Sequence, residues 1–141
     1  MTLRQAVPAD AESLIPILTQ LGYPRAPEEI AQRIQHLAAK GKTAIIIAIE
    51  DQKPVGLAEV HESDTLISGI RAELGALVVA DGHRRKGIGE QLVNAAIEWA
   101  EDNGHNKLRV GTNVIRHDAH AFYEKLGFTL EKQHRLYEKL L

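Results

Sequence analysis

The stretch AELGALVVADGHRRKGIGEQLV, residues 72–93, joins a β-like run to a helix-like pattern through a basic loop that contains glycines. Residues 72–80 are apolar enough to form a strand that is buried on both faces of a sheet. From about Gly87 onward, apolar residues recur at helical spacing until the sequence DNG at residues 102–104 ends the pattern. The residues that carry this spacing are Ile88, Leu92, Ala96 and Trp99. The stretch therefore predicts a strand, a loop and a helix in direct succession.

Strand-like runs occur in both halves of the chain. The β-rich runs at residues 43–50 and 54–62 flank the sequence DQK, which indicates the turn of a hairpin. We expect further strands at residues 2–7 and 107–112, and a closing strand pair within residues 128–141.

Helix signals separate these strands. Asp10 suits the N-cap of one helix, and Pro27 followed by two glutamates suits the first turn of another. Gly127 ends a last helix. The apolar stripes of these three helices comprise Leu14, Leu18 and Leu21; Ile30, Ile34 and Leu37; and Ala119, Phe122, Tyr123 and Leu126. Strands and helices in this order predict an α+β domain around a mixed sheet.

Composition limits the class of protein. With 141 residues, of which 44% are hydrophobic, the chain suits one domain over residues 1–141. The net charge of −2 gives no overall basic field, so we expect neither nucleic acid nor an anionic membrane as a partner. The absence of cysteine excludes disulfides and thiolate metal sites and suits a reducing cytoplasm. The opening MTLRQAVPAD lacks the apolar core of a signal peptide, and no run has the length of a membrane span, so we expect a cytoplasmic protein.

The basic loop has the features of a local anion site. The first N–H groups of a helix have no partner within the helix, and the helix dipole places positive charge at the same end. Glycine at positions 87 and 89 lets a ligand approach the backbone, while Arg84, Arg85 and Lys86 add positive charge. A phosphate or diphosphate group fits these features, although the same residues are also compatible with a solvated surface loop.

Two common phosphate-binding motifs do not match this loop. A P-loop needs a lysine and then serine or threonine after its second glycine, but Ile88 and Gly89 follow Gly87. A dinucleotide fingerprint needs a third glycine, and Leu92 stands in its place. The pattern that remains is Arg84-x-x-Gly87-x-Gly89 after an apolar strand.

This pattern resembles the acyl-CoA diphosphate loop of the GNAT superfamily of N-acetyltransferases, written Q/R-x-x-G-x-G/A. Residues 72–79 resemble the family's central strand, and RHDAHAFYEKLGF at residues 116–128 is similar to its second cofactor segment, N-x-x-A-x-x-L/F-Y-x-x-x-G-F. The resemblance implies a single-domain fold with a mixed, mostly antiparallel sheet flanked by about four helices. It also implies that the central strand splays from the strand at residues 107–112, which forms the acyl-CoA cleft.

The same resemblance assigns a binding role to specific residues. It implies that the pantetheine arm bonds to the backbone of the central strand and that the backbone of the loop wraps the diphosphate, with no metal involved. Arg116 stands where the family has asparagine, and Asn113 is a substitute for that polar contact. The residues assigned to acetyl-CoA binding are Leu77, Val78, Val79, Arg84, Arg85, Lys86, Gly87, Ile88, Gly89 and Asn113.

Catalytic residues are implied in the same way. Tyr123 aligns with the family's general-acid tyrosine, which protonates the departing thiolate. Glu73 aligns with a position that supplies the general base in some members. Glu59, His61 and ordered water are the alternatives for the base. His117 and His120 are three residues apart, and we interpret them as a surface pair because no third metal ligand is suggested by spacing.

The resemblance implies direct transfer of an acetyl group from acetyl-CoA to a primary amine. Glu59, Glu62 and Glu73 favour a cationic acceptor, either a small molecule or a peptide: a polyamine, an aminoglycoside, an amino acid or a protein terminus. A homodimer is left open. The alternative function is a non-catalytic module that binds acetyl-CoA as a sensor or interaction domain.

Overall fold

The computed structural model describes residues 1–111 and 117–141. The chain divides into two compact units, Met1–Val110 and Gly111–Leu141, which are described here in turn. Within the described part of the chain, no helix is both long enough and apolar enough to cross a membrane.

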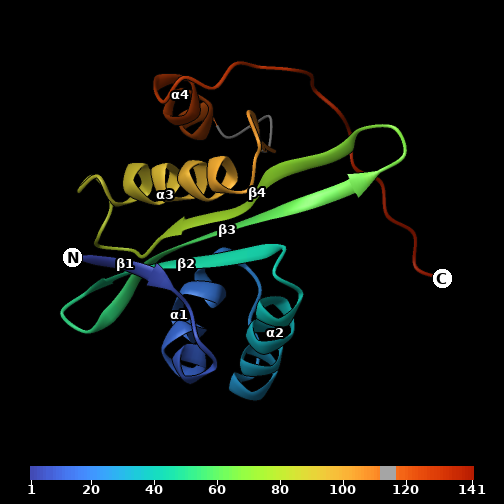
Figure 1. The fold of residues 1–141 in the computed structure, drawn as a ribbon. Helices are drawn as coiled ribbons and strands as arrows, with labels where there is room; N and C mark the ends of the chain where they lie inside the picture. The colour runs from blue at the N-terminus through green and yellow to red at the C-terminus, as the bar shows by residue number, and fades with distance from the viewer. Residues whose placement is uncertain (112–116) are drawn as a thin grey trace. The chain divides into compact units, whose positions relative to one another are not determined.

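The N-terminal unit is built on a five-stranded sheet with the strand order β1-β2-β3-β4-β5 (Figure 1). The first three pairings are antiparallel, and β4 and β5 run parallel. The strands are β1 (Thr2–Gln5), β2 (Thr43–Glu50), β3 (Lys53–Thr65), β4 (Gly69–Val79) and β5 (Leu108–Val110). The expectation of a mixed, mostly antiparallel sheet is confirmed.

Helices cover both faces of this sheet (Figure 1). A short 3-10 turn (Pro8–Asp10) leads into α1 (Ala11–Leu21), which lies beside α2 (Pro27–Lys40) on one face, while α3 (Ile88–Asp102) covers the other. The predicted stripes face the core, because Leu14 of α1 and Leu92 of α3 are almost fully buried. One hydrophobic cluster joins α1 and α2 to the sheet through Ala11, Leu14, Ile17, Ile30, Ile34, Ile47, Leu57 and Val78.

Asp10 occupies the N-cap position of α1, but its side chain does not cap the helix. Its carboxylate instead accepts hydrogen bonds from the Arg4 guanidinium, at 2.8 and 2.9 Å, and from the Val7 N–H at 2.7 Å. The hydrogen bond from Arg4 holds the pKa of Asp10 below its usual value. The sequence correctly places the helix start, but the 3-10 turn before it directs the carboxylate back toward β1.

Two hairpins shape the sheet. The predicted β2–β3 hairpin is confirmed, with Asp51 and Gln52 both in the left-handed region, as a two-residue turn between twisted strands requires. The β3–β4 hairpin is longer than expected, since pairing continues to Thr65 and Gly69. The added residues at the end of this hairpin are partly polar and exposed. They do not alternate between apolar and polar residues, so the sequence pattern did not predict that the strands extend this far.

The parallel pairing of β4 with β5 is short. It involves Ala72, Glu73 and Leu74 of β4 and ends at Leu74, whereas β4 continues along β3 as far as Val79. The β3–β4 register shifts between Glu59 and Val60, so that Gly75 is the extra residue of a β-bulge. Among the described residues, the outer edge of β4 therefore has no strand partner beyond Leu74.

The C-terminal unit contains α4 (His117–Lys125), which ends close to Gly127 in the left-handed conformation as predicted. The prediction of a closing strand pair at residues 128–141 is wrong, because these residues form no strand in the structure. Leu130, Leu136 and Tyr137 are exposed. Strand-compatible residues alone do not form a strand, since each strand needs the backbone groups of a partner.

Candidate functional site

The outer edge of β4 presents backbone groups to a ligand. The N–H of Ala80 donates to the carbonyl of Val55 at 2.8 Å, and Val78 pairs with Leu57 in the same register. Since successive residues of a strand point their backbone groups to opposite sides, Leu77 and Val79 direct theirs away from β3. Val78 lies between them and has its side chain buried.

A glutamine from α1 closes the end of this edge. The Nε2 of Gln20 donates to the Val79 carbonyl, and its Oε1 accepts from the Asp81 N–H, both at 2.9 Å. Sequence reasoning missed this residue. Its partners lie 59 and 61 residues further along the chain, so no local pattern indicates the contact.

The loop after β4 holds several unusual backbone conformations. Gly82, Arg85 and Gly87 all have positive φ angles, of 85°, 64° and 78°. Such a conformation is uncommon for a residue with a side chain, which makes Arg85 notable. Gly87 is the N-cap of α3 and provides no side chain for the cap, and a Cβ added there would meet nothing within 4 Å. The first turn of α3 therefore has no side-chain cap, and the space beside Gly87 is open.

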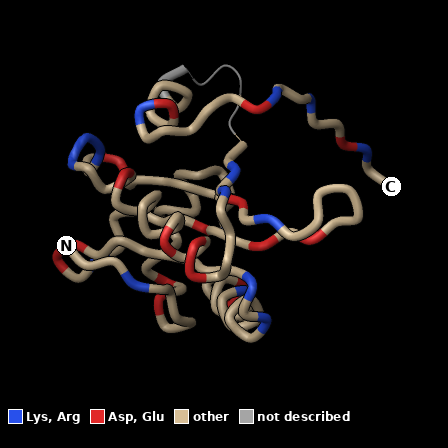
Figure 2. Tube along the Cα trace, turned by 45° about the horizontal axis from the view of Figure 1, so that its top comes forward, with Lys and Arg blue, Asp and Glu red and all other residues tan. Residues whose placement is uncertain are grey.

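Basic residues gather along the loop after β4 (Figure 2), and their side chains make only long contacts with carboxylates. Arg84 lies 3.6 Å from Asp81, and Lys86 lies 3.9 Å from Glu50. These distances are long for ion pairs, and both cationic side chains are more than half exposed. Exposed pairs of this kind contribute little to stability, so these cations can turn to an incoming anion at small cost.

Glu73 lies at the centre of a polar cluster on β3 and β4. Its Oε1 accepts a hydrogen bond from the Arg71 Nε at 2.8 Å and lies 3.4 Å from the Ser63 hydroxyl. Its Oε2 lies 3.6 Å from the Nε2 of His61, the residue opposite it on β3. The structure thus brings together Glu73 and His61, two of the residues proposed as the base.

The bulge at Gly75 makes room for the His61 ring. A Cβ at Gly75 would lie 3.2 Å from Cε1 and 3.3 Å from Nδ1 of His61, which is tighter than ordinary contact. That Nδ1 is buried and has no hydrogen-bond partner in the described structure. The Nδ1 of His83, in the basic loop, is in the same state. Buried polar atoms without partners are rare and mark places where water or a ligand group can bind.

The glutamates of β3 differ in their surroundings. A Cβ at Gly56 would contact Leu92 of α3, so alternation along β3 directs Glu59 and His61 to the face of α1 and α2. Glu62 points to the other face and lies 2.8 Å from the Nε2 of His105, after the end of α3. Glu62 therefore fixes the connection that follows α3, and the carboxylates on the α1–α2 face are those of Glu59 and Glu73.

The remaining predicted residues belong to the C-terminal unit. Tyr123 lies on α4, partly buried, with its ring edge-to-face against Phe122 and Phe128 at centroid distances of 5.1 and 5.6 Å. Asn113 and Arg116, and the side chain of His117, lie outside the described residues. No group of three or more metal-ligating side chains occurs in the part of the chain that the structure describes.

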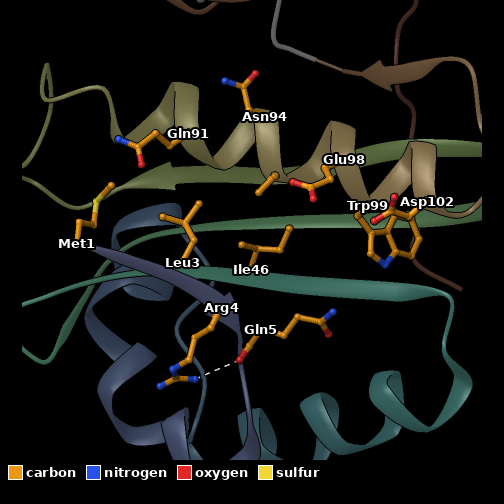
Figure 3. A pocket seen from close by; sticks show the side chains of 11 residues that line it. Met1, Leu3, Arg4, Gln5, Ile46, Gln91, Asn94, Glu98, Trp99 and Asp102 are labelled. Carbon is orange, nitrogen blue, oxygen red and sulfur yellow. Dashed lines mark hydrogen bonds between the residues drawn. The ribbon is translucent and has the colours of Figure 1, made fainter.

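A separate groove of about 600 Å³ runs between β1 and α3 (Figure 3). Leu3 and Gln5 line it from one side, and Gln91, Glu98 and Trp99 from the other. None of the site residues predicted from the sequence lines this groove. The site described above is instead the edge of β4 and the loop that follows it.

Two curated relatives are similar to this chain over different shares of their own length. The uncharacterized N-acetyltransferase YhfO of Bacillus subtilis (strain 168) is 28% identical over 133 residues, which cover 91% of this chain and 89% of YhfO. N-acetyltransferase 8 of Homo sapiens is 31% identical over 83 residues, which cover 58% of this chain but 37% of the human protein. The chain therefore spans nearly all of one relative and about a third of the other.

Solved structures share the fold over nearly their whole length. A Bacillus halodurans C-125 protein named as a transcriptional regulator has a TM-score of 0.86 at 26% identity, covering 98% of this chain and 99% of its own. The aminoglycoside N-acetyltransferase AAC(6')-Iy, in complex with CoA, has a TM-score of 0.82 at 19% identity, covering 99% and 100%. The model of the Acetyltransferase (GNAT) family matches residues 11–128, a range that extends across both units. Since that match covers well over half of its length, the chain belongs to the GNAT family of acetyltransferases.

Proposed function

We propose that the protein is an N-acetyltransferase that moves the acetyl group of acetyl-CoA to a primary amine of a small cationic molecule or peptide. The observation that carries this proposal is the continuity of the site. The outward backbone groups of Leu77 and Val79 lead directly into the basic loop and the uncapped first turn of α3. Because the family match runs from one unit into the other, we also propose that both belong to a single domain.

The residues present fit this donor. An extended arm that carries amide groups can bond to the edge of β4 as an added strand would. A diphosphate needs N–H donors, positive charge and space, and the loop from Arg84 to Gly89 supplies all three. We assign the diphosphate to the backbone of Arg85 to Gly89, including Lys86, Gly87 and Ile88, with Arg84 beside it. The family relation and the CoA complex of a protein with the same fold support this assignment.

Acetyl-CoA supplies an acyl group that is activated as a thioester. The chain must then remove a proton from the acceptor, since an alkylammonium with a pKa of about 10.4 is unprotonated in only about one molecule in a few thousand at pH 7. We propose that Glu73 and His61 perform this task together. Arg71 holds one oxygen of Glu73, and the other oxygen faces His61, so a proton accepted at either group remains within the pair.

The departing thiolate requires a proton in return. We propose that Tyr123 donates it from its hydroxyl group, as the family relation implies. The contacts of its ring with Phe122 and Phe128 hold the side chain within the C-terminal unit.

The acceptor is proposed to be cationic because carboxylates occur on the α1–α2 face of β3 and β4. Glu59 lies there, and Glu73 has one oxygen held by Arg71 and the other facing His61, whereas Glu62 is engaged by His105. Attraction between these carboxylates and an ammonium group favours amines over neutral or acidic acceptors. The fold shared with an aminoglycoside acetyltransferase makes aminoglycosides a natural member of the amines to test.

A panel of amines with acetyl-CoA tests this function. Polyamines, aminoglycosides, amino acids and peptides are incubated with the protein, and free thiol and product mass are measured. Release of thiol together with an acetylated amine supports the proposal. Binding of acetyl-CoA without turnover on any amine would favour the alternative, a sensor or interaction module, which the name of the Bacillus halodurans relative also suggests.

The Glu73→Gln variant tests the base. The side chain keeps its shape but loses its capacity to accept a proton, so kcat should fall by about 10 to 100-fold, most clearly at lower pH where free amine is scarce. The measurement is the pH profile of acetylation with a saturating donor. Glu59→Gln is the matched control on the same face and should change kcat less than about threefold. The reverse order of effects would move the role to Glu59.

A further inference from the structure

We infer that Gln20 is a positioning residue for the acyl donor, which holds the end of the open edge of β4 and the start of the basic loop in one fixed arrangement. This inference rests on the proposed function and adds to it a residue from α1, an element that no feature of the sequence connects to donor binding. Gln20 acts through the backbone of Val79 and Asp81 and does not take part in the chemistry.

The Gln20 carboxamide bonds to the backbone at the end of β4 in the way that the backbone of a neighbouring strand would. Val79 and Asp81 are two residues apart, so their backbone groups point to the same side of the chain. A carboxamide carries a donor and an acceptor next to each other, and Gln20 uses both, at 2.9 Å to the Val79 carbonyl and 2.9 Å to the Asp81 N–H. The hydrogen bond to the Val79 carbonyl is partly buried, which strengthens it relative to a bond in open water, while the bond from the Asp81 N–H is exposed.

This pairing determines where an extended ligand must leave the strand. The outward carbonyl of Val79 is already bonded to Gln20, so the edge offers a ligand the groups of Leu77 and the N–H of Val79. A donor arm that follows β4 therefore meets the Gln20 carboxamide at Val79 and must turn there. The basic loop begins directly after that point and leads to the first turn of α3 at Ile88, and these are the groups that we assign to the diphosphate.

The loop needs such an external support. Three of its residues, Gly82, Arg85 and Gly87, have left-handed backbone conformations, and its cations form only long, exposed ion pairs. Such backbone conformations cost free energy, so they persist only where contacts with the surrounding structure hold them. Inside the loop, the N–H of His83 donates a hydrogen bond to the carbonyl of Ala80 at 3.0 Å. Gln20 adds a connection from the loop to α1, whose end is itself fixed by Gly22.

The two hydrogen bonds of Gln20 require both the length of the glutamine side chain and its two polar atoms. Methionine has nearly the same length and shape but makes neither hydrogen bond, so Gln20→Met removes the pairing with little change in volume. Glutamate keeps an acceptor for Asp81 but places negative charge against the Val79 carbonyl and close to the bound diphosphate. Binding should therefore weaken in the order wild type, Gln20→Met, Gln20→Glu.

Two measurements test the inference. The first is hydrogen exchange of the Asp81 amide, followed by NMR without any ligand, which should become at least about tenfold faster in Gln20→Met because the amide loses its acceptor. The second is titration calorimetry with CoA, in which Kd should rise about tenfold, the effect of one or two lost hydrogen bonds. At saturating acetyl-CoA, kcat should stay within about threefold, because the reacting groups are untouched.

Two control variants separate positioning from general stability. Gln32→Met removes an exposed glutamine from α2 and should leave both readouts unchanged. Ile46→Val removes one methyl group from a buried side chain of the core, and it should lower Tm without raising Kd for CoA. If Ile46→Val raised Kd as much as Gln20→Met at a similar loss of Tm, Gln20 would have a structural role alone.

The outcomes for Gln20 and for the donor are distinguishable. A Gln20→Met protein that binds CoA within twofold of wild type, or that keeps its Asp81 protection, overturns the Gln20 inference and leaves the proposed function intact. A wild-type protein that binds no CoA overturns the proposed function and with it the role of Gln20 toward a donor.

Discussion

Replacing Gly87 with valine should weaken CoA binding by about 100-fold or more. Gly87 has a φ of 78° and is the N-cap of α3, and a Cβ there would project into open space at the start of the helix. A β-branched side chain would occupy the path of the diphosphate and would also disfavour the left-handed backbone that precedes the first N–H groups of α3. Calorimetric titration of CoA into the folded variant is the measurement.

Gly82 supplies a matched control for this variant. Its φ is 85°, and a Cβ there would also meet nothing within 4 Å, so valine at Gly82 imposes a similar backbone cost in the same loop. Gly82 does not cap the helix, and its replacement should weaken CoA binding much less. Equal losses in both variants would mean that backbone strain alone is responsible. Unchanged binding in Gly87→Val would refute the placement of the diphosphate.

The Tyr123→Phe variant should lower kcat by about 10 to 1000-fold and leave the affinity for acetyl-CoA within a few-fold. The phenol has a reference pKa near 10 and a thiol one near 8.5, so proton transfer from the phenol is uphill by about 2 kcal/mol on these values. Thiol release therefore needs only moderate help, which limits the expected effect. The ring itself remains in the variant and keeps its contacts with Phe122 and Phe128.

Steady-state kinetics under conditions in which chemistry limits the rate is the appropriate assay. Tyr137, an exposed tyrosine of the same unit, provides the control, and Tyr137→Phe should keep full activity. If Tyr123→Phe also kept full kcat, the proton would come from elsewhere and Tyr123 would serve only as a packing aromatic.

Local sequence patterns predict the central part of this structure well. The strand at residues 72–80, the loop and the helix from Gly87 each depend on apolar spacing and glycine positions within a few residues, and β4 and α3 agree with them. The hairpin expected at DQK follows from the β-rich runs on both sides, and the structure places its turn at Asp51 and Gln52, with Lys53 already in β3.

Features that depend on distant contacts were not predictable. The Gln20 pairing joins α1 to the end of β4, and the role of Glu62 depends on His105, 43 residues away. The bulge at Gly75, which makes room for His61, is visible only once β3 and β4 are in register. A single sequence shows which residues can form such contacts but not which of them the fold brings together.

The expected strands at residues 128–141 illustrate a related limit. They contain β-compatible residues such as Phe128, Leu130 and Tyr137, as the strands of the sheet do, yet β3 lies between two neighbouring strands, whereas residues 128–141 form no strand. Backbone pairing decides between the two outcomes, and a pattern of side chains does not specify its partner.

The central claim is that the loop after β4 holds the diphosphate of an acyl-CoA donor. Titration calorimetry without added metal, with CoA and with pantetheine, which lacks the diphosphate, tests it most directly. The account predicts that CoA binds at least about 100-fold more tightly than pantetheine, because the N–H groups of α3 and the cations of the loop contact only the former. Equal affinities, or no binding of CoA, would contradict it.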